Sequence, residues 1–200
     1  MGNRSLAYLI SRVLGPLPLL ILLWFVTAVK SGIGFWKALW VYPVILLATI
    51  ILPTSITTFL VATKKVKDIE WSNLKDRQKY LPPLAIISIF LLLILTYWLT
   101  NQTIFHLSLL LSLIIAGMVL TWVIFNFKIS NHLVIATVTF AGVNLFFHFK
   151  FWWLFILLIP IIWARYVLKM HTLAQLIWGF ILPAAIGLLA ILLFGYPAVP

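Results

Sequence analysis

Six polar side chains stand out in a chain that is otherwise almost wholly apolar, and all are of types that bind or transfer phosphate. In chain order they are Arg77, Ser130, His132, Arg165, His171 and Gln175. Arginine guanidinium groups match phosphate oxygens in planar, bidentate geometry. Ser130 stands where a helix N-cap belongs, and the N–H groups of a helix start also favour an anion. The set therefore indicates phosphoryl transfer.

The two histidines suggest how that transfer would proceed. His171 and Gln175 are four residues apart at a predicted helix start, so they share one face. The side-chain carbonyl of Gln175 could accept a hydrogen bond from one ring nitrogen of His171. The other ring nitrogen would then be available as a nucleophile. His132 could donate a proton to the leaving oxygen. This chemistry requires no metal and no cofactor.

The order and spacing of these residues resemble a known family. Ser130-Asn131-His132 and Ala164-Arg165-x5-His171-x3-Gln175 resemble the second and third motifs of the type 2 phosphatidic acid phosphatases, a superfamily of lipid phosphate phosphatases. Those motifs read Ser-Gly-His and Ser-Arg-x5-His-x3-Asp, after a first motif Lys-x6-Arg-Pro. The resemblance implies a phosphatase-like core at about 60–194. It also implies the roles of the residues: His171 as nucleophile, His132 as general acid, and Arg77, Arg165 and Ser130 as phosphate ligands. Lys67, or alternatively Lys75, would supply the cation of the first motif as a further phosphate ligand.

The chain also departs from the family pattern. The departures are Asn131 for Gly, Ala164 for Ser, Gln175 for Asp, Gln78 for the Pro after Arg77, and Glu70 where the first-motif Lys would stand. A neutral Gln does not stabilise an imidazolium as a carboxylate does. Two hypotheses therefore stay open: a metal-independent phosphatase acting on a lipid-linked phosphate or diphosphate, and a weak or inactive relative that binds lipid phosphates or scaffolds membrane partners.

Composition indicates the elements that position these residues. Of the 200 residues 64% are hydrophobic and only 8% are charged, and the mean hydropathy is +1.19. A soluble protein of this size could not hide so much apolar surface, whereas runs of about 20 apolar residues span a bilayer as helices. We predict an all-α fold, a polytopic transmembrane helix bundle forming one integral membrane domain over 1–200. The predicted spans, about seven, are 13–29, 38–62, 82–99, 104–126, 132–148, 151–168 and 173–194.

When the chain is followed through these spans, its charged residues divide between two membrane faces. The first face is the one that receives the N-terminal residues. Only Lys30, Lys37 and Lys150 fall on the second face, and the other 11 of the 14 Lys and Arg residues fall on the first. The positive-inside rule then makes the first face cytoplasmic, with the plasma membrane of a prokaryote as the expected location. Asp68, Glu70 and Asp76 are the only acidic residues, and all lie in the stretch 64–80. Without buried carboxylates, proton-coupled transport and Mg²⁺-dependent chemistry are disfavoured.

Each proposed site residue also has a structural interpretation. Arg165 could snorkel from a helix end to the interface, and His132 could be an ordinary interfacial residue. Gln175 could be a polar contact between helices. His106 and His148 are expected on the opposite face and serve as internal controls. The expected partners are membrane lipids and a lipid phosphate substrate, with no nucleic acid.

Overall fold

A computed structural model describes residues 2–30, 32–69 and 71–194, with the side chains of Leu193 and Phe194 outside the description. The described chain is helical and contains no strand, as predicted. It divides into two compact units, each considered on its own below. Unit 1 comprises residues 1–32 and 128–200, and unit 2 comprises residues 33–127. The prediction of one domain over 1–200 stays a prediction.

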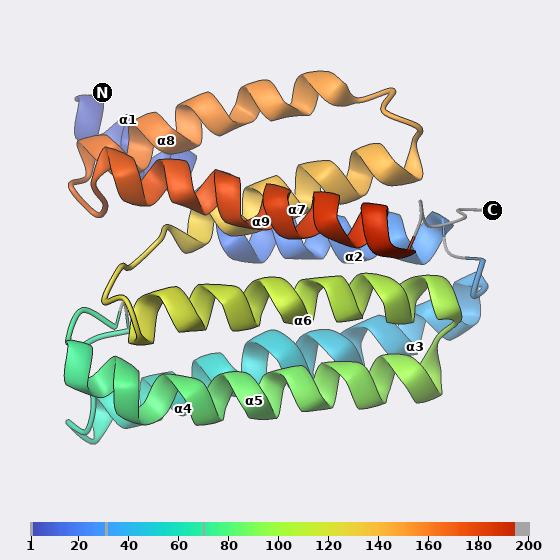
Figure 1. Cartoon of the computed structure of the whole chain (residues 1–200), viewed down its shortest axis with the longest axis horizontal. Coiled ribbons are helices and arrows are strands. Elements are labelled where there is room, and N and C mark those ends of the chain that lie inside the picture. Colours follow the sequence, from blue (N-terminus) through green and yellow to red (C-terminus); the bar gives the residue numbers. More distant parts are fainter. Residues whose placement is uncertain (1, 31, 70, 195–200) are drawn as a thin grey trace. The chain divides into compact units, whose positions relative to one another are not determined.

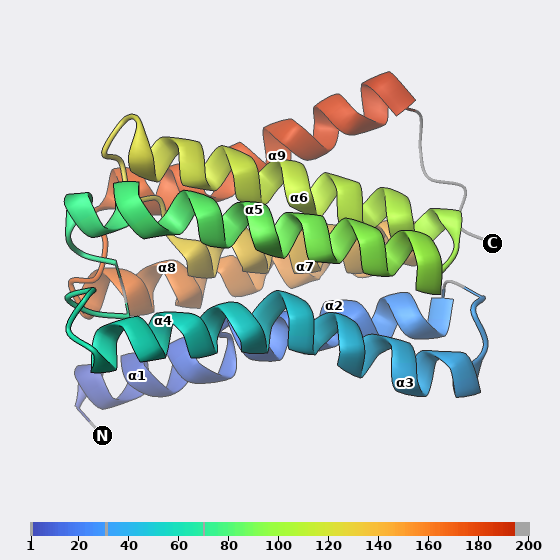
Figure 2. The same ribbon diagram turned by 90° about the horizontal axis from the view of Figure 1, so that it is seen from below.

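Unit 1 is built around one buried helix. Its elements are α1 (Asn3–Val13), α2 (Pro16–Lys30), α7 (Asn131–Phe146), a 3₁₀ turn (Trp152–Leu157), α8 (Leu158–Val167) and α9 (Leu173–Phe194). α7 packs against α2 on one side and against α8 and α9 on others, while α1 packs against α8 (Figures 1 and 2). The core joins Leu133, Ala136 and Phe140 of α7 to Ile161 of α8 and Leu176 of α9.

α1 and α2 are one helical stretch with a bend between them. Pro16 has no N–H to continue the helix, so α1 ends at Val13 and α2 begins at Pro16. The Leu19 N–H resumes the ladder by donating to the Gly15 carbonyl at 3.2 Å. The predicted span 13–29 therefore begins earlier in the structure, with α1 added before it.

Unit 2 contains a bent rod and a hairpin. α3 (Phe35–Leu46), a π-helical turn (Leu47–Ile51) and α4 (Leu52–Ala62) form the rod, and α5 (Leu74–Leu99) and α6 (Gln102–Val123) form the hairpin. The π turn ends two residues before Pro53, whose ring would otherwise clash with the carbonyl four residues earlier. α5 begins at Leu74, not at 82, because the Asn73 side chain caps it by accepting from the Lys75 N–H at 2.9 Å.

Five stretches of the described chain are long and apolar enough to cross a membrane: Asn3–Lys30, Phe35–Ala62, Leu74–Leu99, Gln102–Val123 and Leu173–Leu192. The other two predicted spans, 132–148 and 151–168, correspond to shorter apolar helices, Asn131–Phe146 and Trp152–Val167. At about 1.5 Å per residue, the 16 residues of α7 reach only about 24 Å, against a hydrocarbon core of about 30 Å. The count of about seven spans is thus not confirmed.

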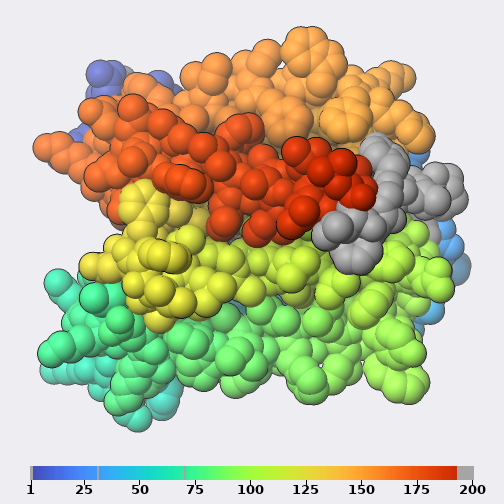
Figure 3. Space-filling view, in the orientation of Figure 1, coloured from blue at the N-terminus to red at the C-terminus, as the bar shows by residue number. Residues whose placement is uncertain are grey.

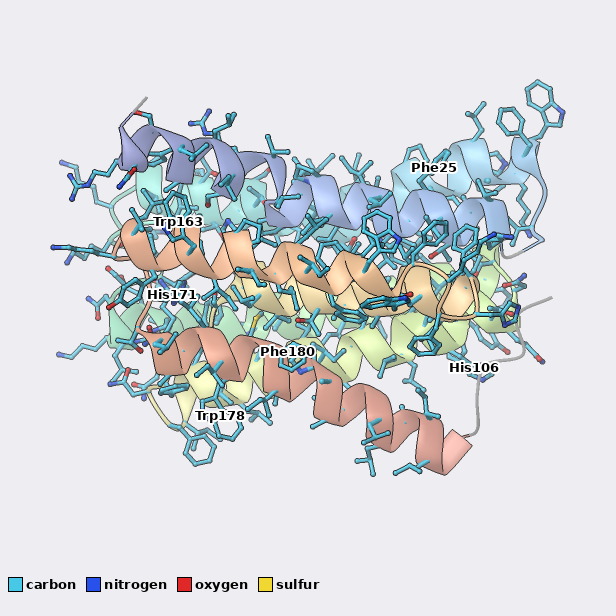
Figure 4. All side chains as sticks on the ribbon, turned by 90° about the horizontal axis from the view of Figure 1, so that it is seen from above. Phe25, His106, Trp163, His171, Trp178 and Phe180 are labelled. Atoms are coloured by element: carbon cyan, nitrogen blue, oxygen red, sulfur yellow. The ribbon has the colours of Figure 1, made fainter. Side chains whose placement is uncertain are left out.

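The outward surfaces of the long helices are apolar, as lipid contact requires. α9 is a clear case: its exposed side chains include Leu173, Ile177, Trp178, Phe180 and Leu188. Its outer surface is seen in red in Figure 3, and Trp178 and Phe180 are labelled in Figure 4. This pattern is compatible with an integral membrane protein.

Candidate functional site

The turn between α8 and α9 explains the spacing of Arg165 and His171. The Met170 N–H donates to the Arg165 carbonyl at 3.1 Å, and the Lys169 N–H donates to the Tyr166 carbonyl at 2.9 Å. With Lys169 in the left-handed region at φ 55°, these bonds form a Schellman motif. The chain therefore reverses within the five residues after Arg165, and His171 lies two residues before Leu173, the first residue of α9.

The start of α9 is fixed by Gln175, the residue expected to orient His171. The Thr172 N–H donates to Gln175 Oε1 at 3.0 Å, and the Gln175 N–H donates to Thr172 Oγ1 at 3.3 Å. This reciprocal pair is a capping box, which satisfies two N–H groups at the helix start. The signal was present in the sequence as Thr-x-x-Gln at 172–175. The predicted role of Gln175 as partner of the His171 ring stays a prediction beside this structural role.

His132 and Arg165 are joined through a residue that the sequence interpretation missed. Arg165 Nη1 donates to Ser11 Oγ at 3.1 Å, and Ser11 Oγ lies 3.3 Å from His132 Nε2. Ser11 belongs to α1, outside the predicted phosphatase-like core at about 60–194. The structure thus brings together two predicted residues from α7 and α8, with α1 supplying the bridge. Arg165 and His171 also both act electrostatically on the His132 ring.

Ser130 is at the predicted N-cap position of α7, but its side chain does not cap the helix. Its hydroxyl is buried and has no hydrogen-bond partner among the described residues. The Ser130 N–H donates to the backbone carbonyl of Gln175 at 3.1 Å, and this hydrogen bond links the start of α7 to α9. Gly179 permits this approach, since a Cβ there would lie 3.0 Å from the Ser130 carbonyl oxygen.

A pocket opens at the α8–α9 turn of unit 1. Tyr166, Lys169, His171, Thr172 and Gln175 are among the residues that line it, and His171 is labelled in Figure 4 at the end of the unit where α9 begins. Lys169, noted in the sequence only as a cation of the basic face, adds a positive charge beside His171. The described lining includes His171 and Gln175 but not His132, Ser130 or Arg165.

The remaining two predicted phosphate ligands, Arg77 and Lys67, belong to unit 2. Arg77 is buried near the start of α5 and donates to the Trp122 carbonyl at 3.3 Å and to Asn126 Oδ1 at 2.8 Å. A guanidinium there satisfies a carbonyl at the end of α6 and complements the helix dipole. The Lys67 N–H donates to Asp76 Oδ2 at 2.9 Å. Their part in phosphate binding stays a prediction, and Glu70 lies outside the described residues.

His148, one of the two controls, lies just beyond the carboxyl end of α7, whereas His132 lies in its first turn. Within the described residues, no group of three or more His, Cys, Asp or Glu side chains is placed to hold a metal ion. No model of a known family, no curated protein and no solved structure matches the chain. What the site does must therefore be inferred from its own residues.

Proposed function

We propose that this protein is an integral membrane phosphatase that hydrolyses a lipid-linked phosphate or diphosphate through a phosphohistidine. The observation that most supports the proposal is the joining of His132 and Arg165 through Ser11 at the end of unit 1 where His171 lines a pocket. The residues proposed as general acid, anion ligand and nucleophile thus come from separate segments of one unit. The lipid tail of the substrate would stay in the bilayer while its phosphate enters the pocket.

In the proposed reaction, a ring nitrogen of His171 attacks phosphorus and a P–N bond forms. The P–O bond to the leaving group breaks, and His132 donates its proton to the departing oxygen. Water then attacks the phosphohistidine, with His132 accepting a proton, to release inorganic phosphate and restore His171. Positive charge from Arg165 and Lys169 stabilises the transition state, in which negative charge is spread over the phosphoryl oxygens.

The start of α9 adds to the anion-binding character of the pocket. α9 is a helix of 22 residues, so its amino end presents the positive end of the helix dipole. Thr172 and Leu173 at this end line the same pocket as Lys169 and His171. A phosphate bound there would face a cation and a helix start together.

The test is hydrolysis of short-chain phosphatidic acid and of a polyprenyl diphosphate by purified protein in detergent with EDTA. His171→Ala should abolish phosphate release, and parent protein trapped by acid-free quenching should contain phosphohistidine. His106→Ala is the matched control, because His106 is exposed on α6 in unit 2. Release by His171→Ala at the parent rate would refute the mechanism.

A weak or inactive relative that binds lipid phosphates is the second candidate, and two observations favour it. The Gln175 carboxamide oxygen is engaged by the Thr172 N–H, and the guanidinium of Arg165 is engaged by Ser11. Binding of a fluorescent phosphatidic acid to the protein without phosphate release would support this candidate. Restored phosphate release in Gln175→Asp would instead show that the residue at position 175 sets the rate of an active enzyme.

We further propose that unit 1 presents its basic end to the cytoplasm across a prokaryotic plasma membrane. Arg4, Arg12, Lys128, Arg165 and Lys169 occur at one end of its helices, and only Lys30 and Lys150 at the other. Lys30 Nζ lies 4.6 Å from the centroid of the Phe147 ring, just beyond the carboxyl end of α7. The chain has no cysteine, so single cysteines at 4 and 150, both in unit 1, can be labelled without background in intact cells. Labelling of 4 but not 150 by an impermeant reagent would reverse the orientation.

A further inference from the structure

Ser11 is the polar member of the buried face of α1. Ala7, Ser11 and Gly15 follow one another at intervals of four residues and are buried, whereas the large side chains Leu6, Tyr8, Leu9 and Val13 are exposed. α1 packs against α8, where Ala164 is fully buried. Small residues on both helices permit a close approach of the backbones. A hydroxyl in this contact is removed from water and must find its partners within the protein.

The partners that Ser11 finds are the two residues that the proposed mechanism uses most directly after the nucleophile. Ser11 Oγ accepts from Arg165 Nη1 at 3.1 Å and lies 3.3 Å from His132 Nε2. Ser11, Arg165 and His132 come from α1, α8 and α7, so the contact among them depends on the packing of three separate helices. Ser11 therefore links three helices of unit 1.

A hydroxyl is suited to both protonation states of His132. It has one proton to donate and two lone pairs with which to accept. When Nε2 of His132 lacks a proton, Ser11 can donate to it while accepting from Arg165. When Nε2 is protonated, Ser11 can accept from both neighbours. The charged or titratable groups that act on the His132 ring are Arg165 from α8 and His171 from the α8–α9 turn.

We propose that Ser11 is a positioning residue that holds His132 and Arg165 in their working geometry as a proton is lost and regained at His132. The inference rests on the proposed phosphatase function for its catalytic consequence. It makes α1 part of the functional site, although the motifs that suggested the activity begin only beyond residue 60. Its structural content, the Ser11–His132 hydrogen bond, can be tested without any activity.

The first experiment is structural. The chain has four histidines, so nitrogen-15 labelling of the imidazoles in detergent micelles gives few signals, which His→Asn variants assign. Ser11→Ala should move the Nε2 chemical shift of His132, which reports its tautomer, and leave that of His148 unchanged. Ser5→Ala, an exposed serine on the same helix, should move neither. Unchanged His132 signals in Ser11→Ala would overturn the inference, whether or not the protein is a phosphatase.

The second experiment is catalytic. Ser11→Ala should lower kcat at least about tenfold, since a misplaced catalytic group costs up to about 10²-fold. The pH at which kcat is half-maximal should also move, which a smaller fraction of folded protein would not cause. Ser11→Thr, which keeps the hydroxyl, should recover kcat if the protein folds, and Ser5→Ala should match the parent. If the parent protein releases no phosphate from any lipid phosphate, the proposed function is refuted. The role of Ser11 is then decided by the nitrogen-15 signals of His132 in the first experiment. Parent-like kcat and pH dependence in Ser11→Ala would refute the positioning role alone.

Discussion

Gly179→Ala tests how tightly α9 must lie against α7 in unit 1. A Cβ at 179 would lie 2.8 Å from Leu133 Cβ and 3.0 Å from the Ser130 carbonyl oxygen. Both neighbours are firm, one being the first side-chain carbon of a fully buried residue and the other a backbone atom. Neither can turn away by a change of rotamer. The added methyl group must therefore push α9 away from the start of α7.

The magnitude follows from two opposing terms. Alanine in place of glycine within a helix stabilises by about 0.5–1 kcal/mol. Forcing an extra methyl group into a packed contact costs about 1–3 kcal/mol. Gly187 lies on the same helix, and a Cβ there would meet nothing within 4 Å. Gly187→Ala should thus gain the helix propensity of alanine without the cost of a crowded methyl group. We expect Gly179→Ala to be less stable than Gly187→Ala by about 1–3 kcal/mol.

The assay is reversible unfolding in mixed micelles as the fraction of SDS is raised, followed by circular dichroism. Both variants replace glycine by alanine in the same helix, so the contribution of helix propensity cancels in the difference between their stabilities. Equal stability, or a more stable Gly179→Ala, would mean that α9 does not approach α7 as closely as the structure shows. The same displacement should move Ser130 and the start of α9, so phosphate release by Gly179→Ala should fall as well, whereas Gly187→Ala should keep the parent rate.

Three further substitutions have matched controls. Arg77→Ala removes the hydrogen bonds to the Trp122 carbonyl and to Asn126, and should destabilise unit 2 by about 1.5–3 kcal/mol in SDS titration, whereas the exposed Lys79→Ala should not. Thr172→Ala breaks the capping box and should cost about 1 kcal/mol, with Thr172→Ser close to the parent, and equal stability of the two would contradict the capping role. Asn144→Ala leaves the Phe151 carbonyl without its 3.1 Å donor and should cost about 1–3 kcal/mol, with faster hydrogen exchange in residues 147–152 than in the parent; unchanged exchange there would refute the role of Asn144.

The sequence predicted best what depends on long apolar runs. The stretch 173–194 was found as a helix with the predicted ends, and 38–62 and 104–126 were found with ends displaced by at most three residues. Each of these runs is long enough to cross the core of a bilayer, so hydropathy shows it clearly. The two shorter apolar helices of unit 1, Asn131–Phe146 and Trp152–Val167, were located within two residues of their predicted ends, but their assignment as membrane spans was not confirmed. α7 has 16 residues, and most of them are buried by protein, so the length rule for a lipid-facing helix does not apply to it. Hydropathy alone does not distinguish a buried helix of this length from a span.

The sequence predicted the helix end near Arg165 and the helix start after His171, but not the tertiary contacts of the candidate site. The positions of Arg165 and His171 followed from spacing, because a helix end and a helix start fill the residues between them. Ser11 could not be found, since a single serine in an amphipathic helix has no local signal for a histidine 121 residues away. The bonds of Arg77 to the end of α6 likewise join residues 45 and 49 apart. The capping box of Thr172 and Gln175 could also be predicted from local sequence, because its two residues are three apart.

The left-handed residues that end several helices offer a route to a more robust protein for biochemical work. Lys64 at φ 57° follows α4 as the turning residue of a Schellman motif. His148 at φ 51° follows α7, where the Phe149 N–H donates to the Asn144 carbonyl at 2.8 Å. An L residue other than glycine pays about 1–2 kcal/mol in this conformation. Lys64→Gly and His148→Gly should therefore raise the melting temperature together, with one contribution from each unit. Neither residue belongs to the proposed site, so such a variant would be a stabilised background for the activity measurements described above.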